Sequence, residues 1–153
     1  MKNINPLYLL IGAGVLLLVG GGFGVTKLLE ESPEEKEQRQ KANDYLKILR
    51  EILSGPWYQN IKASLNITPA NMPNPQKLTQ KANIIWDAIG IFSDNEAAIS
   101  GVFASLKSKL EAYALAGEFR NRFNRDLFQY LGKNLNREEM VYLGSLIANK
   151  PDQ

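Results

Sequence analysis

The helical character of this chain is clearest in residues 93–148, which read SDNEAAISGVFASLKSKLEAYALAGEFRNRFNRDLFQYLGKNLNREEMVYLGSLIA. Four helix starts can be recognised here, because a side chain that can cap a helix precedes each apolar segment. The capping residues are Ser93, Ser108, Asp126 and Asn136. Ser93 and Asn136 are each followed by a glutamate three positions later, as in a capping box. We therefore predict four short helices in this stretch.

Apolar residues recur at helical spacing along these segments, as expected for helices with one buried face. Pro75 opens a fifth helix of this kind and Gly90 ends it, while Asn124 is a candidate left-handed residue at a helix end. The predicted stripes are Leu78, Ala82, Ile85 and Ile89; Ile99, Val102, Phe103 and Leu106; Ala112, Leu115, Ala116, Phe119 and Phe123; Leu127, Tyr130 and Leu131; and Met140, Leu143 and Ile147. We predict that residues 77–153 form a compact all-α bundle.

A largely polar helix is expected before this bundle. Ser32-Pro33-Glu34-Glu35 combines a capping serine, a proline suited to the first helical position and a glutamate that completes a capping box. Residues 34–41 are polar on every side, which is typical of a solvated spacer. An apolar stripe follows, formed by Ala42, Tyr45, Leu46, Leu49, Ile52 and Leu53. We interpret residues 32–54 as a stalk and docking helix, and the proline- and asparagine-rich residues 55–76 as an irregular linker.

The N-terminal residues 1–31 have the composition of a transmembrane anchor. No charged residue occurs in residues 3–26, and the apolar run at 7–25 has about the 20 residues that a bilayer core requires. The residues assigned to the membrane anchor are Leu7, Leu9, Leu10, Ile11, Val15, Leu16, Leu17, Leu18, Val19 and Val25. A cleaved signal peptide is the alternative, but a single lysine precedes the run and no A-x-A site follows it.

Gly20 and Gly24 lie on one face of the predicted anchor and would permit close helix–helix contact, and therefore oligomers. The alternative is that a glycine-rich span contains such pairs without any seam. Lysine and arginine are more numerous on the C-terminal flank of the anchor, which favours a cytoplasmic body. We expect a single-pass protein of a host or viral membrane. The charge count does not decide on which side of that membrane the body lies.

Composition excludes several kinds of chemistry. The 153 residues contain no cysteine and no histidine, so disulfides, thiolate metal sites and Ser-His or Cys-His nucleophiles are excluded. The net charge of +2 provides no broad field for nucleic acid. A basic cluster is interpreted as a solvated surface, and it comprises Lys107, Lys109, Arg120, Arg122 and Arg125. We expect no enzyme activity, no cofactor and no metal ion.

The alternative function is a membrane-tethered, carboxylate-dependent hydrolase of cell-wall glycan, which would need two carboxylates beside a cleft. The candidates are Asp87, Asp94, Glu96, Glu111 and Glu118. Asp94 and Glu96 suit a helix N-terminus, and Glu111 and Glu118 are expected on a solvated face. We therefore favour a structural or interaction protein that holds a helical body near a bilayer and binds a protein partner.

Residues 93–148 also resemble a single annexin repeat. The resemblance rests on DNEAAI at 94–99, on the helix end at 119–123, and on NRDL at 124–127, where the family has Gly-Arg-Asp-Leu. It implies a helical fold. The stretch is similar, too, to single-repeat stretches of phage proteins, which implies a virion or phage membrane protein that links a membrane to a capsid or envelope component.

Annexins bind acidic membranes through calcium, which a Gly-x-Gly loop and a distant carboxylate hold. In this chain the corresponding loop, 91–94, reads IFSD without those glycines, and Asn134 stands at the position similar to the carboxylate. Calcium prefers several oxygen ligands that include carboxylates. Both departures argue against a calcium site.

Overall fold

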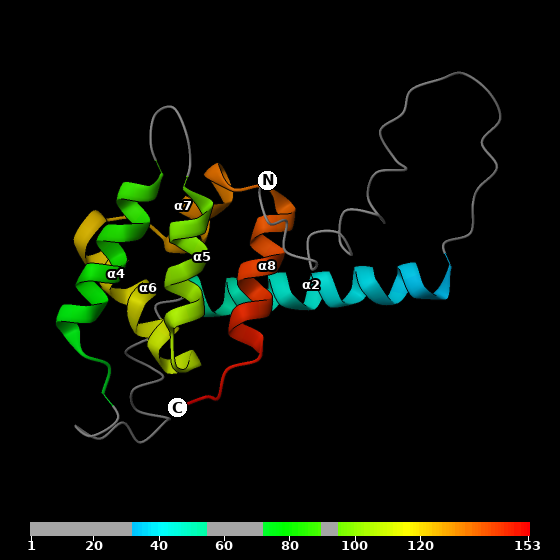
Figure 1. Ribbon diagram of the computed structural model, residues 1–153, viewed down its shortest axis with the longest axis horizontal. Helices are drawn as coiled ribbons and strands as arrows, with labels where there is room; N and C mark the ends of the chain where they lie inside the picture. The colour runs from blue at the N-terminus through cyan, green and yellow to red at the C-terminus, as the bar shows by residue number, and fades with distance from the viewer. Residues whose placement is uncertain (1–31, 55–71, 90–94) are drawn as a thin grey trace, which may run out of the picture. The chain divides into compact units, whose positions relative to one another are not determined.

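The computed structural model describes residues 32–54, 72–89 and 95–153 (Figure 1). Their regular structure consists of six helices: α2 (Pro33–Leu53), α4 (Pro75–Ala88), α5 (Glu96–Ser105), α6 (Lys109–Phe123), α7 (Leu127–Asn134) and α8 (Arg137–Ala148). The prediction of an all-α protein is confirmed for these residues. The predicted anchor at 7–25 lies outside them, and none of the six helices is sufficiently long and apolar to span a bilayer.

The chain divides into two compact units, Met1–Asp44 and Tyr45–Gln153, and α2 contributes to both. In the first unit, the predicted capping box is present: the Glu35 N–H donates to Ser32 Oγ at 3.2 Å, and the Ser32 N–H donates to Glu35 Oε2 at 2.8 Å. An ion pair one helical turn apart joins Lys41 and Glu37 at 2.7 Å, and both side chains are well exposed. Residues 32–41 are all exposed, as expected for a helix that is polar on every side.

Short polar side chains begin the helices of the second unit; those of Ser108, Asp126 and Asn136 were predicted, and Asn74 before Pro75 was not. Each of these side chains accepts a hydrogen bond from the backbone N–H three residues later. The bonds run from Lys77 to Asn74 at 3.1 Å, from Glu111 to Ser108 at 3.2 Å, from Gln129 to Asp126 at 2.9 Å, and from Glu139 to Asn136 at 3.0 Å. The Glu139 carboxylate accepts the Asn136 N–H in return, which completes the predicted box. Asn124 has φ 52° and ends α6 in the left-handed conformation, also as predicted.

The predicted start of α5 at Ser93 is wrong by two residues. Asn95 is the capping residue, and its side chain accepts the Ala98 N–H at 3.0 Å. Its own N–H donates to the Ala88 carbonyl at 2.7 Å. This bond joins the residue before α5 to the last residue of α4, so a contact between two helices fixes the start of α5.

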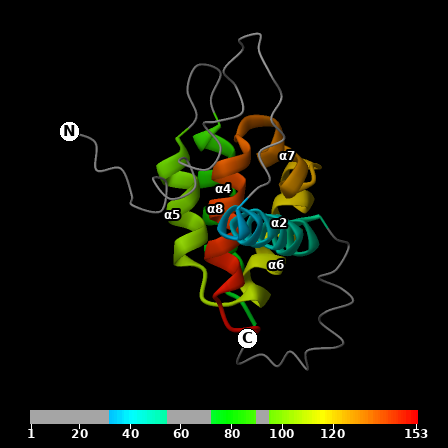
Figure 2. The ribbon, with the colours of Figure 1, turned by 90° about the vertical axis from the view of Figure 1, so that its right-hand side faces the viewer.

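Four helices of the second unit form a bundle in which α4 contacts α5 and α6, and α8 contacts the same two helices from the other side (Figure 2). The short helix α7 contacts α6 and α8. The predicted stripes supply most of the core, to which Leu110 and Leu135 are unpredicted additions. The largest fully buried side chains are Leu49, Leu53, Ile85, Ile99, Phe103, Leu110, Leu115, Phe119, Leu127, Leu131 and Ile147. Ile89, Phe123 and Tyr130 are only partly buried and pack at the edge of this core.

The C-terminal end of α2 belongs to this bundle. Leu49, Ile52 and Leu53 are buried in its core, which confirms the predicted docking stripe at those positions. At Gly144 of α8 the backbones approach so closely that an added Cβ would lie 2.8 Å from the carbonyl carbon of Tyr45. A glycine is therefore required where α2 meets α8.

Candidate functional site

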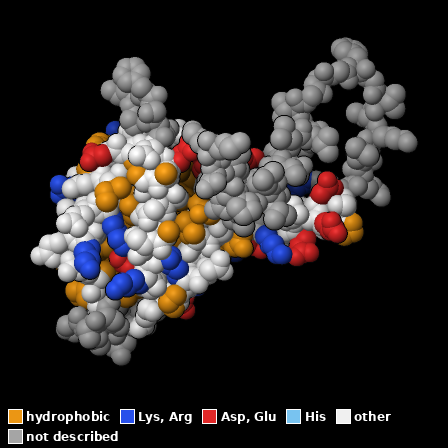
Figure 3. Space-filling view, viewed as in Figure 1, with side chains coloured by type: hydrophobic (Ala, Val, Ile, Leu, Met, Phe, Trp, Pro, Cys, Tyr) orange, Lys and Arg blue, Asp and Glu red, His pale blue; other side chains and the backbone are white. Residues whose placement is uncertain are grey.

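A groove lies between α4 and α5 on the surface of the described bundle. Its volume is about 500 Å³, and Figure 3 shows apolar and basic side chains gathered over these helices. The lining residues are Lys77, Gln80, Lys81 and Ile84 of α4, and Ala98, Gly101, Val102 and Ser105 of α5. Each set follows the spacing i, i+3, i+4, i+7, so the groove is formed by one face of each helix.

Two features of the groove have no role in packing the described bundle. Ile84 is 45% exposed, although the stripe on the neighbouring face of α4 is buried. Gly101 lies in the middle of α5, and a Cβ added there would meet no atom within 4 Å. A glycine in a helix interior is about 1 kcal/mol less favourable than alanine. The contrast with Gly144, whose missing side chain makes room for Tyr45, shows that Gly101 leaves its space open.

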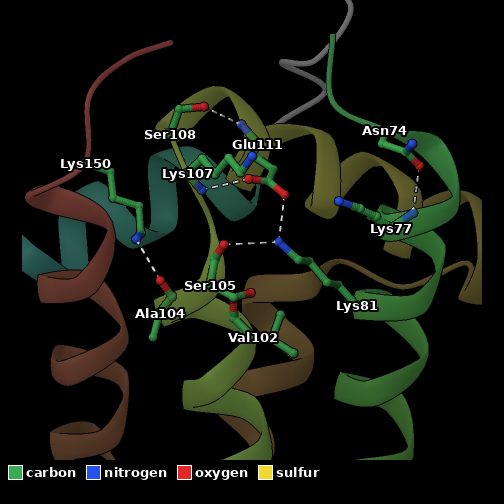
Figure 4. A network of polar contacts seen from close by, with 10 residues as sticks. All are labelled: Asn74, Lys77, Lys81, Val102, Ala104, Ser105, Lys107, Ser108, Glu111 and Lys150. Atoms are coloured by element: carbon green, nitrogen blue, oxygen red, sulfur yellow. Dashed lines mark hydrogen bonds and ion pairs between the residues drawn. The ribbon is translucent and has the colours of Figure 1, made fainter. Parts of the chain in front are cut away.

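A polar network closes one end of the groove (Figure 4). The Lys81 ammonium donates to Glu111 Oε1 at 2.7 Å and reaches the Ser105 carbonyl at 3.5 Å. The Lys107 N–H donates to Glu111 Oε2 at 2.7 Å, and the Lys150 ammonium donates to the Ala104 carbonyl at 3.1 Å. Two lysines thus bind carbonyls at the C-terminus of α5, where positive charge is favourable.

Glu111 is the anionic centre of this network. Burial alone would raise the pKa of its carboxyl group, but hydrogen bonds from Lys81 and from the Lys107 N–H, together with the positive charges of these lysines, hold the pKa below its usual value. The side chains of Lys81 and Glu111 are 15% and 14% exposed. Little solvent therefore screens this ion pair, which fixes α4 against α6.

The prediction that Glu111 and Glu118 lie on a solvated face is wrong. Glu118 is partly buried and accepts the Thr79 hydroxyl at 2.7 Å, so both carboxylates face side chains of α4. The physical reason is that residues seven apart share a helix face, and this face of α6 packs against α4. Asp87 and Glu96 are exposed, and Asp94 lies outside the described residues.

The basic cluster is largely engaged within the bundle. Arg120 pairs with Asp126 at 2.7 Å, and Lys109 pairs with Asp152 at 2.9 Å. Arg122 donates to the side-chain oxygen of Asn83 at 2.6 Å. Three of the five predicted cationic side chains therefore have intramolecular partners, although Arg120 and Arg122 also remain exposed to solvent.

The structure adds an aromatic group that the sequence did not single out. Trp86 stacks with Phe123 at a ring-centroid distance of 4.3 Å and with Tyr130 at 5.2 Å, and both pairs are nearly parallel. These rings join α4, α6 and α7 at the edge of the core. Trp86 directly follows the buried Ile85, and this position beside the stripe was the signal available in the sequence.

Several predicted site residues lie outside the described residues, namely the membrane-anchor side chains, the Gly20 and Gly24 pair, and the annexin-like loop at 91–94. Asn134 is described, and its side-chain amide donates to the Tyr130 carbonyl at 2.7 Å. In the described parts of the chain, no group of three or more acidic side chains is placed to hold a metal ion. No protein-family model, curated protein or solved structure matches this chain.

Proposed function

We propose that this chain is a single-pass, membrane-anchored interaction protein whose helical body binds a protein partner through the groove between α4 and α5. The anchor in this proposal is the apolar run at 7–25, and the polar part of α2 is the spacer that precedes the body. The setting that we propose is a host or viral membrane, with a capsid or envelope component as the partner.

The observation that carries the proposal is the pairing of Ile84 and Gly101 in one groove. An exposed isoleucine costs free energy of hydration, and a helix-interior glycine costs about 1 kcal/mol of helix stability. Within the described bundle, no atom occupies the space beside Gly101, and nearly half of the Ile84 surface stays exposed. Departures from local stability rules that have no internal role are expected at functional sites.

Three partly buried carboxylates of the body support binding rather than catalysis as the proposed role. Glu111 is held by Lys81, Glu118 by Thr79, and Asp126 by Arg120. Each of these carboxylates stabilises a contact between segments of the fold. A glycan hydrolase would instead need two carboxylates that are free to meet a substrate.

Site-specific photocrosslinking in native membranes would test this function. The full chain would carry p-benzoylphenylalanine in place of Ile84, and a matched chain would carry it in place of the exposed Gln129 of α7. We expect a discrete adduct with one protein from position 84 and none from position 129. Equal labelling from both positions, or no adduct from position 84, would contradict a docking role for the groove.

The anchor is tested separately by extraction of the same membranes with alkaline carbonate. A chain with a transmembrane helix stays in the pellet, whereas a chain held only by protein contacts is released. Release of the intact chain would contradict the anchored part of the proposal and leave the groove result unaffected.

A further inference from the structure

The groove between α4 and α5 is about two helical turns long and is lined by one face of each helix. Its lining extends from Lys77 to Ile84 on α4 and from Ala98 to Ser105 on α5. At a rise of about 1.5 Å per residue, each set covers roughly 10 Å, or about two helical turns. Two neighbouring helices that present i, i+3, i+4 and i+7 positions to a shared groove commonly hold the apolar face of a third helix.

Elsewhere in the bundle, a glycine in a helix interior allows the backbone of a second helix to approach closely. At Gly144 the backbone of Tyr45 in α2 occupies the place where a Cβ would stand. Gly101 is also in a helix interior, but the corresponding space beside α5 is open. A second helix can therefore approach α5 at Gly101 as closely as α2 approaches α8 at Gly144. An extended strand or a loop is narrower than a helix and would not need the space that the missing side chain at Gly101 provides.

The charge of the groove favours a partner helix that carries an acidic side chain. The ionisable side chains that line the groove are Lys77 and Lys81, both cationic. Glu111 neutralises Lys81 across a 2.7 Å ion pair. Lys77 is exposed, and within the described residues its ammonium group makes no ion pair or hydrogen bond. A partner would therefore gain from a carboxylate placed against Lys77, and a lysine there would be repelled.

From these observations we infer that the groove binds an amphipathic α-helix of a partner protein, with an apolar face of about two turns that crosses α5 at Gly101 and a carboxylate that pairs with Lys77. This inference rests on the proposed function and adds to it the class of partner. Ile84 would pack against the apolar face of the incoming helix, and the network around Glu111 would keep the groove at its present width.

The test uses the full chain in detergent and a panel of fluorescein-labelled, hydrocarbon-stapled helical peptides. Each peptide has an alanine- and leucine-rich face flanked by glutamates, and a matched peptide has lysines in place of the glutamates. Fluorescence anisotropy measures binding. We expect saturable binding of acidic peptides and at least tenfold weaker binding of their lysine counterparts, with the difference reduced by Lys77→Gln.

Gly101→Leu fills the groove with a side chain and should weaken binding of the acidic peptides at least tenfold. Gly132→Leu is the matched control, because Gly132 lies in the interior of α7 and a Cβ there makes only an ordinary contact with Met140 at 3.8 Å. A thermal melt of each variant shows whether it folds. If Gly101→Leu does not fold, Gly101→Ser provides the same comparison with a smaller side chain.

Three outcomes would overturn the inference: no peptide of the panel binds, lysine peptides bind as well as acidic ones, or a folded Gly101→Leu protein binds as well as the unmodified chain. Its failure can be distinguished from failure of the proposed function. An adduct from position 84 in membranes, combined with no binding of acidic helices, would retain the docking groove and reject this class of partner.

Discussion

Replacing Gly101 and Gly144 by alanine should change stability in opposite directions, although both substitutions add one methyl group to a helix interior. Alanine is about 1 kcal/mol more favourable than glycine in a helix. At Gly101 the new Cβ meets nothing within 4 Å, so the whole gain should appear as stability. At Gly144 the Cβ collides with the Tyr45 carbonyl group, which is backbone and cannot rotate away.

Overpacking of this kind costs typically about 1–3 kcal/mol, and a collision with backbone belongs at the upper end of that range. After the gain of about 1 kcal/mol in helix propensity, Gly144→Ala should be destabilising by about 2 kcal/mol net. The two variants should then differ by about 3 kcal/mol. For a body of roughly 100 residues, each kcal/mol corresponds to a shift of about 4–8 °C in Tm.

Urea unfolding of the full chain in detergent, followed by tryptophan fluorescence and by circular dichroism, would measure both changes. Gly132→Ala serves as the control for helix propensity alone, because its Cβ would make only an ordinary contact. The reasoning would be refuted by a destabilised Gly101→Ala variant or by a Gly144→Ala variant as stable as the unmodified chain. Either result would mean that the space beside the two glycines does not differ as described.

Three further predictions concern single side chains. Glu111→Gln should destabilise the body by about 1–3 kcal/mol at neutral pH, because Lys81 loses its counterion in a poorly solvated place. Since the pKa of Glu111 is lowered on folding, its contribution is present above the usual pKa of 4.5 and is lost as the pH falls below it, so denaturation midpoints of the two proteins should converge in acid. Asn124→Ala should cost about 1 kcal/mol in urea unfolding because alanine tolerates the left-handed conformation poorly, whereas Asn124→Gly should cost less than half of that. Trp86→Leu should cost about 1–3 kcal/mol through the lost stacking on Phe123 and Tyr130 and should remove most of the near-ultraviolet circular dichroism; an unchanged spectrum would contradict the stacked arrangement.

Helix starts could be predicted from the sequence because a capping bond joins residues only three positions apart. Ser32, Ser108, Asp126 and Asn136 therefore identified their helices directly. The start of α5 could not be placed as well, because several capping side chains occur in succession there. The choice of Asn95 depends on its bond to Ala88, which involves the preceding helix.

The candidate site could not be predicted in the same way. The partners of Glu111 and Glu118 lie in α4, 30 and 39 positions earlier in the chain, and no local pattern encodes such distances. The groove is lined by the side of α4 next to its buried stripe, where Lys77 and Lys81 look like ordinary surface lysines. Gly101 is informative only because its surroundings in three dimensions are open.

The close contact at Gly144 also has a mechanical consequence. The backbone of Tyr45 lies against this glycine, so the axial register of α2 on α8 depends on the missing side chain at position 144. Sliding α2 by one turn, about 5.4 Å, would move Tyr45 away from the glycine and place it beside residues that carry side chains. Under tension along α2 the contact should therefore behave as a latch that releases in one step. Optical-trap extension of the chain would show a single rupture, and Gly144→Ala would lower the force at which it occurs.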